Sequence, residues 1–226
     1  MPDTRPGLKF DKNGVCCACI TYDKQNDTDW KSRWSELEKL CDKYRGCNGD
    51  GYDCAIAVSG GKDSHFQAHI LKEKLGMNPL LLSVENIEWT KIGWKNFNNI
   101  SDAFGCDIIA FHPNVKVARK MFKKAFEKLG SPTWYQDYLM YSFPVRMSMK
   151  LGIKLLVYGE DVNYTYGGEF NVETPSAMLQ PQNNVTKPVW DEWFENNEIT
   201  KKDLESIKQP TIEECEEFGL DPIYLS

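Results

Sequence analysis

Short apolar runs alternate with amphipathic stretches through the middle of the chain. The runs have strand length, and the stretches between them carry apolar residues at the spacing of one helix face. Strands are predicted at residues 54–58, 79–84, 107–111 and 153–158. Helices are predicted at residues 30–44, 64–75, 91–104, 115–129 and 135–151. Glycines close several of these helices just before a strand, so we expect an α/β, Rossmann-like fold with a parallel sheet and flanking helices.

The two ends of the chain differ from this middle part. Residues 1–28 are rich in Pro, Gly, Asp and Asn and are expected to be irregular, with Asp29 as the N-cap of the first helix. Residues 191–217 carry ten acids against three lysines, which indicates a polar, peripheral segment. We therefore divide the chain into an N-terminal cysteine-containing segment (1–50), a central nucleotide-binding domain (51–190) and an acidic C-terminal segment (191–226). The apolar ending at residues 223–226 looks like part of a strand and suggests truncation.

Composition places the chain among ordinary globular proteins. Its 226 residues are 41% hydrophobic and 27% charged, which suits one α/β domain with an appendage. No apolar run approaches the roughly 18 residues of a membrane span, and the first residues lack the apolar core of a signal peptide. We expect a cytoplasmic protein without a membrane partner.

Charge argues against a large nucleic-acid surface, because the net charge is −6 and phosphate contacts need clustered Lys and Arg. One basic stretch lies at residues 116–128, where the basic residues alternate with apolar ones. The pattern is typical of the solvated face of an amphipathic helix, and contact with a phosphate is the alternative.

The eight cysteines indicate reduced thiols or a metal site rather than disulfides in such a protein. Cys16 and Cys19 form a C-x₂-C pair, which is half of a tetrahedral zinc site. Zinc at this pair and ordinary thiols are the two interpretations that remain open. Cys54 and Cys106 start predicted strands and are expected in the core.

A turn of small residues follows the strand at 54–58 and precedes a helix. It consists of Ser59, Gly60, Gly61, Lys62, Asp63 and Ser64. Adjacent glycines let a backbone approach an anion closely, and the turn's N–H groups and the helix start then face one point. Lys62 adds a positive charge, and Asp63 could hold Mg²⁺ against phosphate oxygens. The spacing differs from G-x-x-x-x-G-K-[ST], so this is a phosphate-binding turn of another kind.

A second candidate region follows the last predicted strand. Glu160 and Asp161 lie directly after it, and Tyr166, Gly167 and Gly168 come next. In parallel sheets, ligands bind beyond the carboxyl ends of the strands, so this region should lie near the turn. We expect the two acids to contact a metal or the substrate, with helix capping as the alternative. The aromatic and glycine residues suit a ring-shaped ligand.

The turn resembles the SGGxDS signature of the PP-loop ATP pyrophosphatases, which cleave ATP between the α- and β-phosphates. The whole chain resembles, more narrowly, the N-acetyl sugar amidotransferases of bacterial O-antigen and flagellin-glycan synthesis. The motifs that carry this narrower resemblance are residues 2–7, 14–19, 52–64, 76–80, 104–107, 158–161 and 166–168.

The resemblance implies a specific activity. The acetamido oxygen of an N-acetyl sugar or sugar nucleotide would take AMP from ATP, and ammonia would then give an acetamidino group. Lys62 and Asp63 would be the catalytic pair, with Mg²⁺ on Asp63 and the rest of the turn holding phosphates. No glutaminase motif is visible, so the resemblance implies a separate glutaminase subunit as partner. A tRNA-modifying thiolase or lysidine-type enzyme and a non-catalytic nucleotide-binding subunit are the alternatives.

Overall fold

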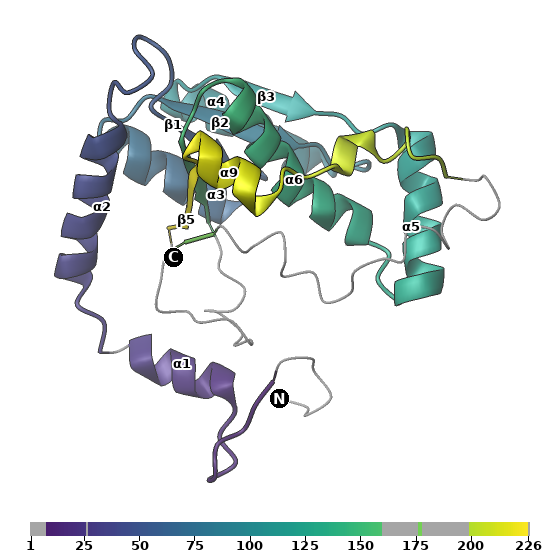
Figure 1. Ribbon diagram of the computed structural model, residues 1–226, viewed down its shortest axis with the longest axis horizontal. Coiled ribbons are helices and arrows are strands. Elements are labelled where there is room, and N and C mark those ends of the chain that lie inside the picture. The colour runs from purple at the N-terminus through teal and green to yellow at the C-terminus, as the bar shows by residue number, and fades with distance from the viewer. Residues whose placement is uncertain (1–7, 26, 160–175, 178–198, 226) are drawn as a thin grey trace.

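The computed structural model describes residues 8–25, 27–159, 176–177 and 199–225, and its centre is a five-stranded parallel sheet (Figure 1). The strand order is β3-β2-β1-β4-β5, and each neighbouring pair is parallel. The strands are β1 (Cys54–Ala57), β2 (Pro79–Val84), β3 (Ile108–Phe111), β4 (Leu155–Tyr158) and β5 (Asp221–Tyr224). The chain runs outward from β1 to β3 and then returns to the other side of β1. This order confirms the expected α/β, Rossmann-like fold and places a switch point between β1 and β4.

Helices cover both faces of the sheet (Figure 1). One face carries α2 (Trp30–Tyr44), α3 (Lys62–Ala68), η1 (His69–Lys74) and α4 (Lys91–Phe104). The other carries α6 (Trp134–Lys150) and α9 (Ile212–Phe218). Side chains alternate between the faces along each strand, so Ile56 packs in the first layer and Ala55 in the second. The apolar pattern of the strands therefore corresponds to burial on both sides.

A third cluster extends the core beyond the sheet. There α5 (Val115–Leu129) packs on α6, with Met121 and Leu139 fully buried. The 3-10 helix η3 (Glu205–Ile207) adds Ile207 to the same cluster. In Figure 1, α5 stands at one end of the molecule, beyond the strands.

Several predicted bounds are confirmed. The strand at 79–84 and the helices at 30–44, 91–104 and 115–129 have the expected ends. Their caps explain why: the Asp29 side chain accepts from the backbone N–H groups of Lys31 and Ser32, and Gly105 closes α4 in the left-handed region. Cys54 and Cys106 are buried, as expected of core thiols.

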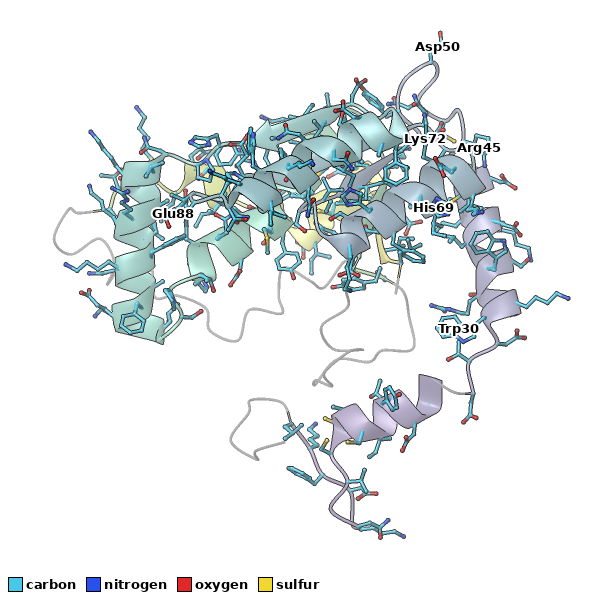
Figure 2. All side chains as sticks on the ribbon, turned by 180° about the vertical axis from the view of Figure 1, so that it is seen from behind. Trp30, Arg45, Asp50, His69, Lys72 and Glu88 are labelled. Carbon is cyan, nitrogen blue, oxygen red and sulfur yellow. The ribbon has the colours of Figure 1, made fainter. Side chains whose placement is uncertain are left out.

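The expectation of an irregular N-terminus was wrong for part of residues 1–28. Residues Cys17–Gln25 form helix α1, which follows a tight turn closed by a bridge between Phe10 and Cys16. The Asp11 side chain accepts from the N–H groups of Asn13 and Val15 and so holds this turn. Both views place α1 away from the sheet (Figures 1 and 2). The local hydrogen bonds of the turn start a helix that composition alone had not indicated.

The peripheral interpretation of the acidic C-terminal segment was incomplete. Strand β5 pairs with β4 in the sheet, and Ile223 is part of the core. Cys215 of α9 packs on the opposite face, and a capping box between Thr211 and Glu214 starts that helix. The four glutamates of α9 are exposed, whereas a few apolar residues pack this part of the segment on the domain.

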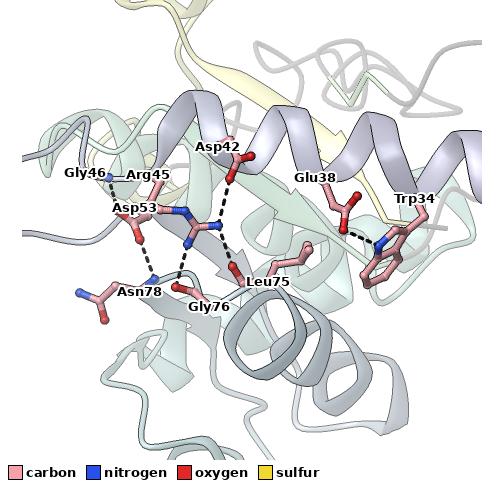
Figure 3. A network of polar contacts seen from close by, with 9 residues as sticks. All are labelled: Trp34, Glu38, Asp42, Arg45, Gly46, Asp53, Leu75, Gly76 and Asn78. Atoms are coloured by element: carbon pink, nitrogen blue, oxygen red, sulfur yellow. Dashed lines mark hydrogen bonds and ion pairs between the residues drawn. The ribbon is translucent and has the colours of Figure 1, made fainter.

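A polar network joins α2 to the base of the sheet (Figure 3). The Arg45 guanidinium donates to the carbonyl oxygens of Leu75 at 2.7 Å and Gly76 at 2.8 Å. The Asp53 carboxylate accepts from the backbone N–H groups of Gly46 at 2.7 Å and Asn78 at 2.8 Å. Because Asp53 precedes β1 and Asn78 precedes β2, this network sets the start of the two central strands.

Candidate functional site

The bend between β1 and α3 faces solvent, as a phosphate-binding turn must. Ser59, Gly61, Lys62 and Asp63 are exposed. Gly60 has φ +81° and its Cα lies against α4: a Cβ built there would be 2.7 Å from the Cα of Phe97. Only glycine satisfies both conditions, so the bend can pass close beneath α4.

Serine hydroxyls brace the bend from within. The Ser64 Oγ accepts from the Ser59 N–H at 2.9 Å, and the two hydroxyl oxygens are 3.4 Å apart. The Ser59 Oγ also accepts from the Gly61 N–H at 3.4 Å. Ser64 is 3% exposed, so its role in this structure is to hold the bend's shape. Ser59 remains at the surface, where its hydroxyl can also reach a ligand.

Lys62 and Asp63 form an ion pair at the start of α3. The Lys62 Nζ lies 2.6 Å from the Asp63 Oδ1, and their side chains are 89% and 61% exposed. An exposed pair of this kind stabilises the fold little. Both groups can therefore exchange partners when a phosphate or a cation arrives.

A hollow of about 190 Å³ lies beside the bend at the carboxyl edge of the sheet. It is bordered by the ends of β1, β2 and β4, by α3 on one face and by α6 on the other. The lining residues are Ala57, Val58, Ser59, Asp63, Ser64, Gln67, Leu82, Val84, Asn86, Met140, Tyr141, Pro144, Tyr158 and Gly159. The hollow thus sits at the switch point of the sheet, where ligands of such folds bind.

Four polar residues of this lining were not among the predicted site residues: Gln67, Asn86, Tyr141 and Tyr158. Gln67 lies one turn after Asp63 on α3, and Asn86 lies two residues beyond β2, so their spacing from the bend and the strand was a usable signal. Tyr141 comes from α6, which no motif marks. The Tyr158 hydroxyl donates to the Tyr141 carbonyl at 3.1 Å. Burial raises the pKa of Tyr158 well above its usual value, so this phenol is a neutral donor at the pocket wall.

An acid–imidazole pair lies next along the same edge. The His112 Nδ1 is 2.7 Å from the Glu85 Oε2, and Glu85 follows β2 directly. The Gln136 amide nitrogen donates to the Glu85 carbonyl at 3.2 Å and ties α6 to this strand end. Glu85 precedes the pocket residue Asn86, so this pair stands beside the hollow rather than in it.

All five predicted substrate contacts fall in one part of the chain, directly after β4. Glu160, Asp161, Tyr166, Gly167 and Gly168 lie outside the described residues. Gly159, the residue before them, does border the hollow. Their assignment stays a prediction.

The residues at the bend fit the groups that ATP and Mg²⁺ would require. Asp63 offers an exposed carboxylate oxygen next to the hollow, which is the ligand type that Mg²⁺ prefers. Lys62 offers a cation within reach of the same point. Gly60 and Gly61 leave the backbone of the bend open to close approach by phosphate oxygens.

The structure brings the thiols of Cys16 and Cys19 together, as their C-x₂-C spacing predicts. The two Sγ atoms are 3.5 Å apart. Hydrogen bonding with the backbone and thiol of Cys19 lowers the pKa of Cys16, and the contact between the two thiols raises the pKa of Cys19. Across the described ranges, no three His, Cys, Asp or Glu side chains gather to hold a metal ion. Structural zinc needs four ligands, so the described residues do not support the zinc interpretation of this pair.

In the described part of the chain, no helix combines the length and apolarity needed to cross a membrane.

No protein-family model matches the chain. It is 26% identical over 177 residues to the uncharacterized protein MJ1599 of Methanocaldococcus jannaschii, and this match covers 78% of the chain and 62% of that protein. The chain thus spans about three fifths of this relative's length. Among solved structures, it resembles a predicted subunit of tRNA methyltransferase from M. jannaschii at 17% identity and a TM-score of 0.40, covering 76% of this chain and 66% of the other. It also resembles the U34-tRNA thiolase NcsA of Methanococcus maripaludis, solved with its 4Fe–4S cluster, at 16% identity and a TM-score of 0.42, covering 86% and 59%.

Proposed function

We propose that the protein is an ATP pyrophosphatase of the PP-loop kind, which transfers AMP to a carbonyl oxygen of an acceptor. The single observation that carries this proposal is the solvent-facing bend of Ser59–Ser64 beside a hollow at the sheet's switch point. The bend joins a strand to a helix and holds an exposed cation and an exposed carboxylate, as transfer of an adenylyl group requires.

Each residue of the bend has a role in this proposal. Gly60 and Gly61 present the backbone to the phosphates, and Ser59 donates from its hydroxyl. The Lys62 ammonium group separates from Asp63 and neutralises the negative charge that builds on the departing pyrophosphate. Asp63 would then hold Mg²⁺, which screens the phosphate oxygens when bound. Ser64 keeps the bend in shape through its bond to the Ser59 N–H.

The acceptor that we propose is the acetamido group of an N-acetyl sugar or sugar nucleotide. Its support is the resemblance of the whole chain to the N-acetyl sugar amidotransferases. The amide oxygen attacks the α-phosphorus and pyrophosphate leaves. Ammonia then adds to the activated carbon, and AMP departs with the original oxygen, so an acetamidino group and a proton remain. Glu160, Asp161, Tyr166, Gly167 and Gly168 would contact this substrate, and a separate glutaminase would supply ammonia in the cytoplasm.

Pyrophosphate release tests the proposal. The protein is incubated with ATP, Mg²⁺, ammonium and a panel of UDP- and CMP-linked N-acetyl sugars. We expect pyrophosphate and AMP in equal amounts with at least one sugar, and loss of about 10²-fold or more in Lys62→Ala, on the scale of removing one transition-state contact. Lys91→Ala, an exposed lysine outside the bend, is the matched control. Nucleotide binding without release in any mixture would instead favour a non-catalytic subunit.

A tRNA acceptor is the second candidate, and one surface favours it. Helix α5 carries six basic residues and one acidic residue, in a chain whose net charge is −6. Its exposed cations are Lys116, Arg119, Lys120, Lys123 and Lys128. The two solved structures described above are also tRNA enzymes by name. A row of cations on one helix face is the footprint expected for a phosphate backbone.

Charge reversal on α5 separates the two acceptors. Replacing Lys116, Arg119 and Lys123 by Glu should abolish tRNA-dependent pyrophosphate release and lower the salt dependence of tRNA binding. The same variant should keep turnover of a sugar acceptor within about twofold, because surface substitutions of this kind change stability little. Equal losses with both acceptors would show that α5 matters for the fold rather than for substrate choice.

A further inference from the structure

Gln67 is a buried polar side chain at the hollow, and only part of its amide is hydrogen-bonded. It lies on α3 one turn after Asp63, is 3% exposed, and borders the hollow. Its Nε2 donates to the Asp63 carbonyl at 3.2 Å. Its Oε1 is covered and has no hydrogen-bond partner in the described structure.

The opposite wall explains why Gln67 is held there. A Cβ built on Gly159, at the end of β4, would overlap the Gln67 Nε2 and lie 2.9 Å from its Cδ. Gly159 therefore leaves the space that the amide occupies. The amide is pressed between α3 and the end of β4, directly beside the bend.

The unpaired Gln67 Oε1 destabilises the fold, and it can also accept a hydrogen bond from a ligand. A buried polar atom without a partner destabilises the fold, and most such atoms in native proteins are paired. A ligand with an N–H group that enters the hollow would remove this cost. The terminal torsion of glutamine is soft, so a small rotation turns Oε1 toward the hollow.

We infer that Gln67 accepts a hydrogen bond from the N–H of an amide or lactam whose carbonyl oxygen takes the adenylyl group. This inference rests on the proposed function and names the chemistry that its site selects. A hydrogen-bond acceptor at the amide N–H raises the electron density on the nitrogen and, through resonance, on the amide oxygen. That oxygen is then a better nucleophile. As the oxygen binds phosphorus, positive charge builds on the nitrogen, and the Oε1 dipole stabilises it. Gln67 is thus a positioning residue for the acceptor and has no direct role in holding ATP.

Secondary amides of N-acetyl sugars and the lactam of a uridine base share this O=C–N–H unit. Gln67 would recognise this shared unit in either acceptor. The experiment therefore tests the N-acetyl sugar and the tRNA separately. A tertiary amide has the same carbonyl but no N–H, so it serves as the negative probe.

Gln136 provides a matched control. It is also a buried glutamine with an unpartnered Oε1 and an Nε2 that donates to a backbone carbonyl. It borders the acid–imidazole pair and does not line the hollow. Gln67→Met and Gln136→Met therefore remove the same groups at two sites, and only the first should affect the acceptor.

The first test is kinetic. With the sugar panel or tRNA as acceptor, Q67M should raise the KM for the acceptor about 10-fold, the size of one neutral hydrogen bond, and leave ATP binding unchanged. Q136M should keep the wild-type acceptor KM. A sugar acceptor methylated on its acetamido nitrogen should be poor for the wild type and no poorer for Q67M. Equal acceptor KM values in Q67M and wild type, or a further loss with the methylated acceptor, would overturn the inference.

The second test needs no turnover. The Gln67 side-chain amide is identified in a ¹⁵N-labelled protein by its absence in Q67M, and N-methylacetamide is then titrated with and without α,β-methylene-ATP and Mg²⁺. We expect the Gln67 signal to shift with N-methylacetamide and to stay in place with N,N-dimethylacetamide. If the Gln67 signal shifts equally with both amides, or shifts with neither, Gln67 does not accept a hydrogen bond from an amide N–H. Failure of the wild type to bind the nucleotide analogue would count against the proposed function, and the nucleotide-free titration still decides the role of Gln67.

Discussion

Gly60 and Phe97 are in backbone contact: a Cβ built on the glycine would lie 2.7 Å from the Cα of the phenylalanine and 3.0 Å from its N. Phe97 is 4% exposed and packs on Trp89, with ring centroids 5.1 Å apart. The bend therefore packs against a buried part of α4. The shape of the proposed phosphate site depends on this contact as much as on the local sequence.

Gly60→Ala should disable the bend, because it introduces both a left-handed alanine and an overlap with backbone atoms that cannot move aside. We expect a loss of about 2–4 kcal/mol in unfolding free energy and no measurable ATP binding by calorimetry. Gly130→Ala, outside the bend, is the control. Gly130 also has a positive φ of +67°, but its added Cβ would meet nothing within 4 Å. ATP binding of Gly60→Ala at the wild-type level would contradict the proposed site.

Gly159→Ala should displace the Gln67 amide, because the two groups cannot share the same space. We expect a loss of about 1–3 kcal/mol in unfolding free energy, measured by urea denaturation. The double variant Gly159→Ala, Gln67→Ala should be more stable than the sum of the two single changes predicts, since the smaller side chain makes room for the new methyl group. If the losses in unfolding free energy of the two single variants simply add, Gly159 and the Gln67 amide do not interact.

Cys41 should make the protein less stable as the pH rises from 9 to 11. Burial raises the pKa of Cys41 from 9.0 to about 11, so the folded state keeps its proton where the unfolded chain has lost it. The stabilisation is complete below pH 9 and is lost as the pH passes 11. Urea midpoints measured across this range should fall less steeply for Cys41→Ala than for the wild type. Cys47→Ala, at an exposed thiol, should keep the wild-type slope.

Arg45, the C-cap residue of α2, should contribute more to stability than Arg33, which lies inside that helix and has similar exposure. Its guanidinium donates to two backbone carbonyls at the end of η1, whereas Arg33 makes an exposed ion pair of 3.7 Å with Glu36. The two side chains are each 40% exposed. Arg45→Met should cost about 1–2 kcal/mol and Arg33→Met less than about 0.5 kcal/mol in urea denaturation. Similar losses would mean that the carbonyl contacts of Arg45 add nothing beyond a surface charge.

The metal hypothesis for the cysteine pair has a direct test. Two thiolates from Cys16 and Cys19 should bind Co²⁺ with a weak thiolate charge-transfer band, far below that of a four-thiolate site, unless ligands from another polypeptide join. Cys19→Ser should remove the band, and Cys47→Ser should leave it unchanged. A full four-thiolate spectrum from this chain alone would contradict the half-site geometry.

The sequence by itself determined the alternation of strands and helices, since apolar periodicity and local caps such as Asp29 depend only on neighbouring residues. It also located the bend of Ser59–Ser64, because a strand, two glycines and a helix are contiguous in the chain. Helix α1 was missed, since the side chain of Asp11 that organises its turn acts through specific hydrogen bonds and not through composition.

Only the tertiary structure decided what surrounds the bend. The order of the strands brings Gly159 and Tyr158 beside β1, and it adds β5 from a segment that its acidic sequence marked as peripheral. Gln67 has no motif of its own and gains its place because α3 presses it against the end of β4. Contacts of this kind join residues about 90 positions apart in the chain. They depend on how whole elements pack, so local sequence patterns do not predict them.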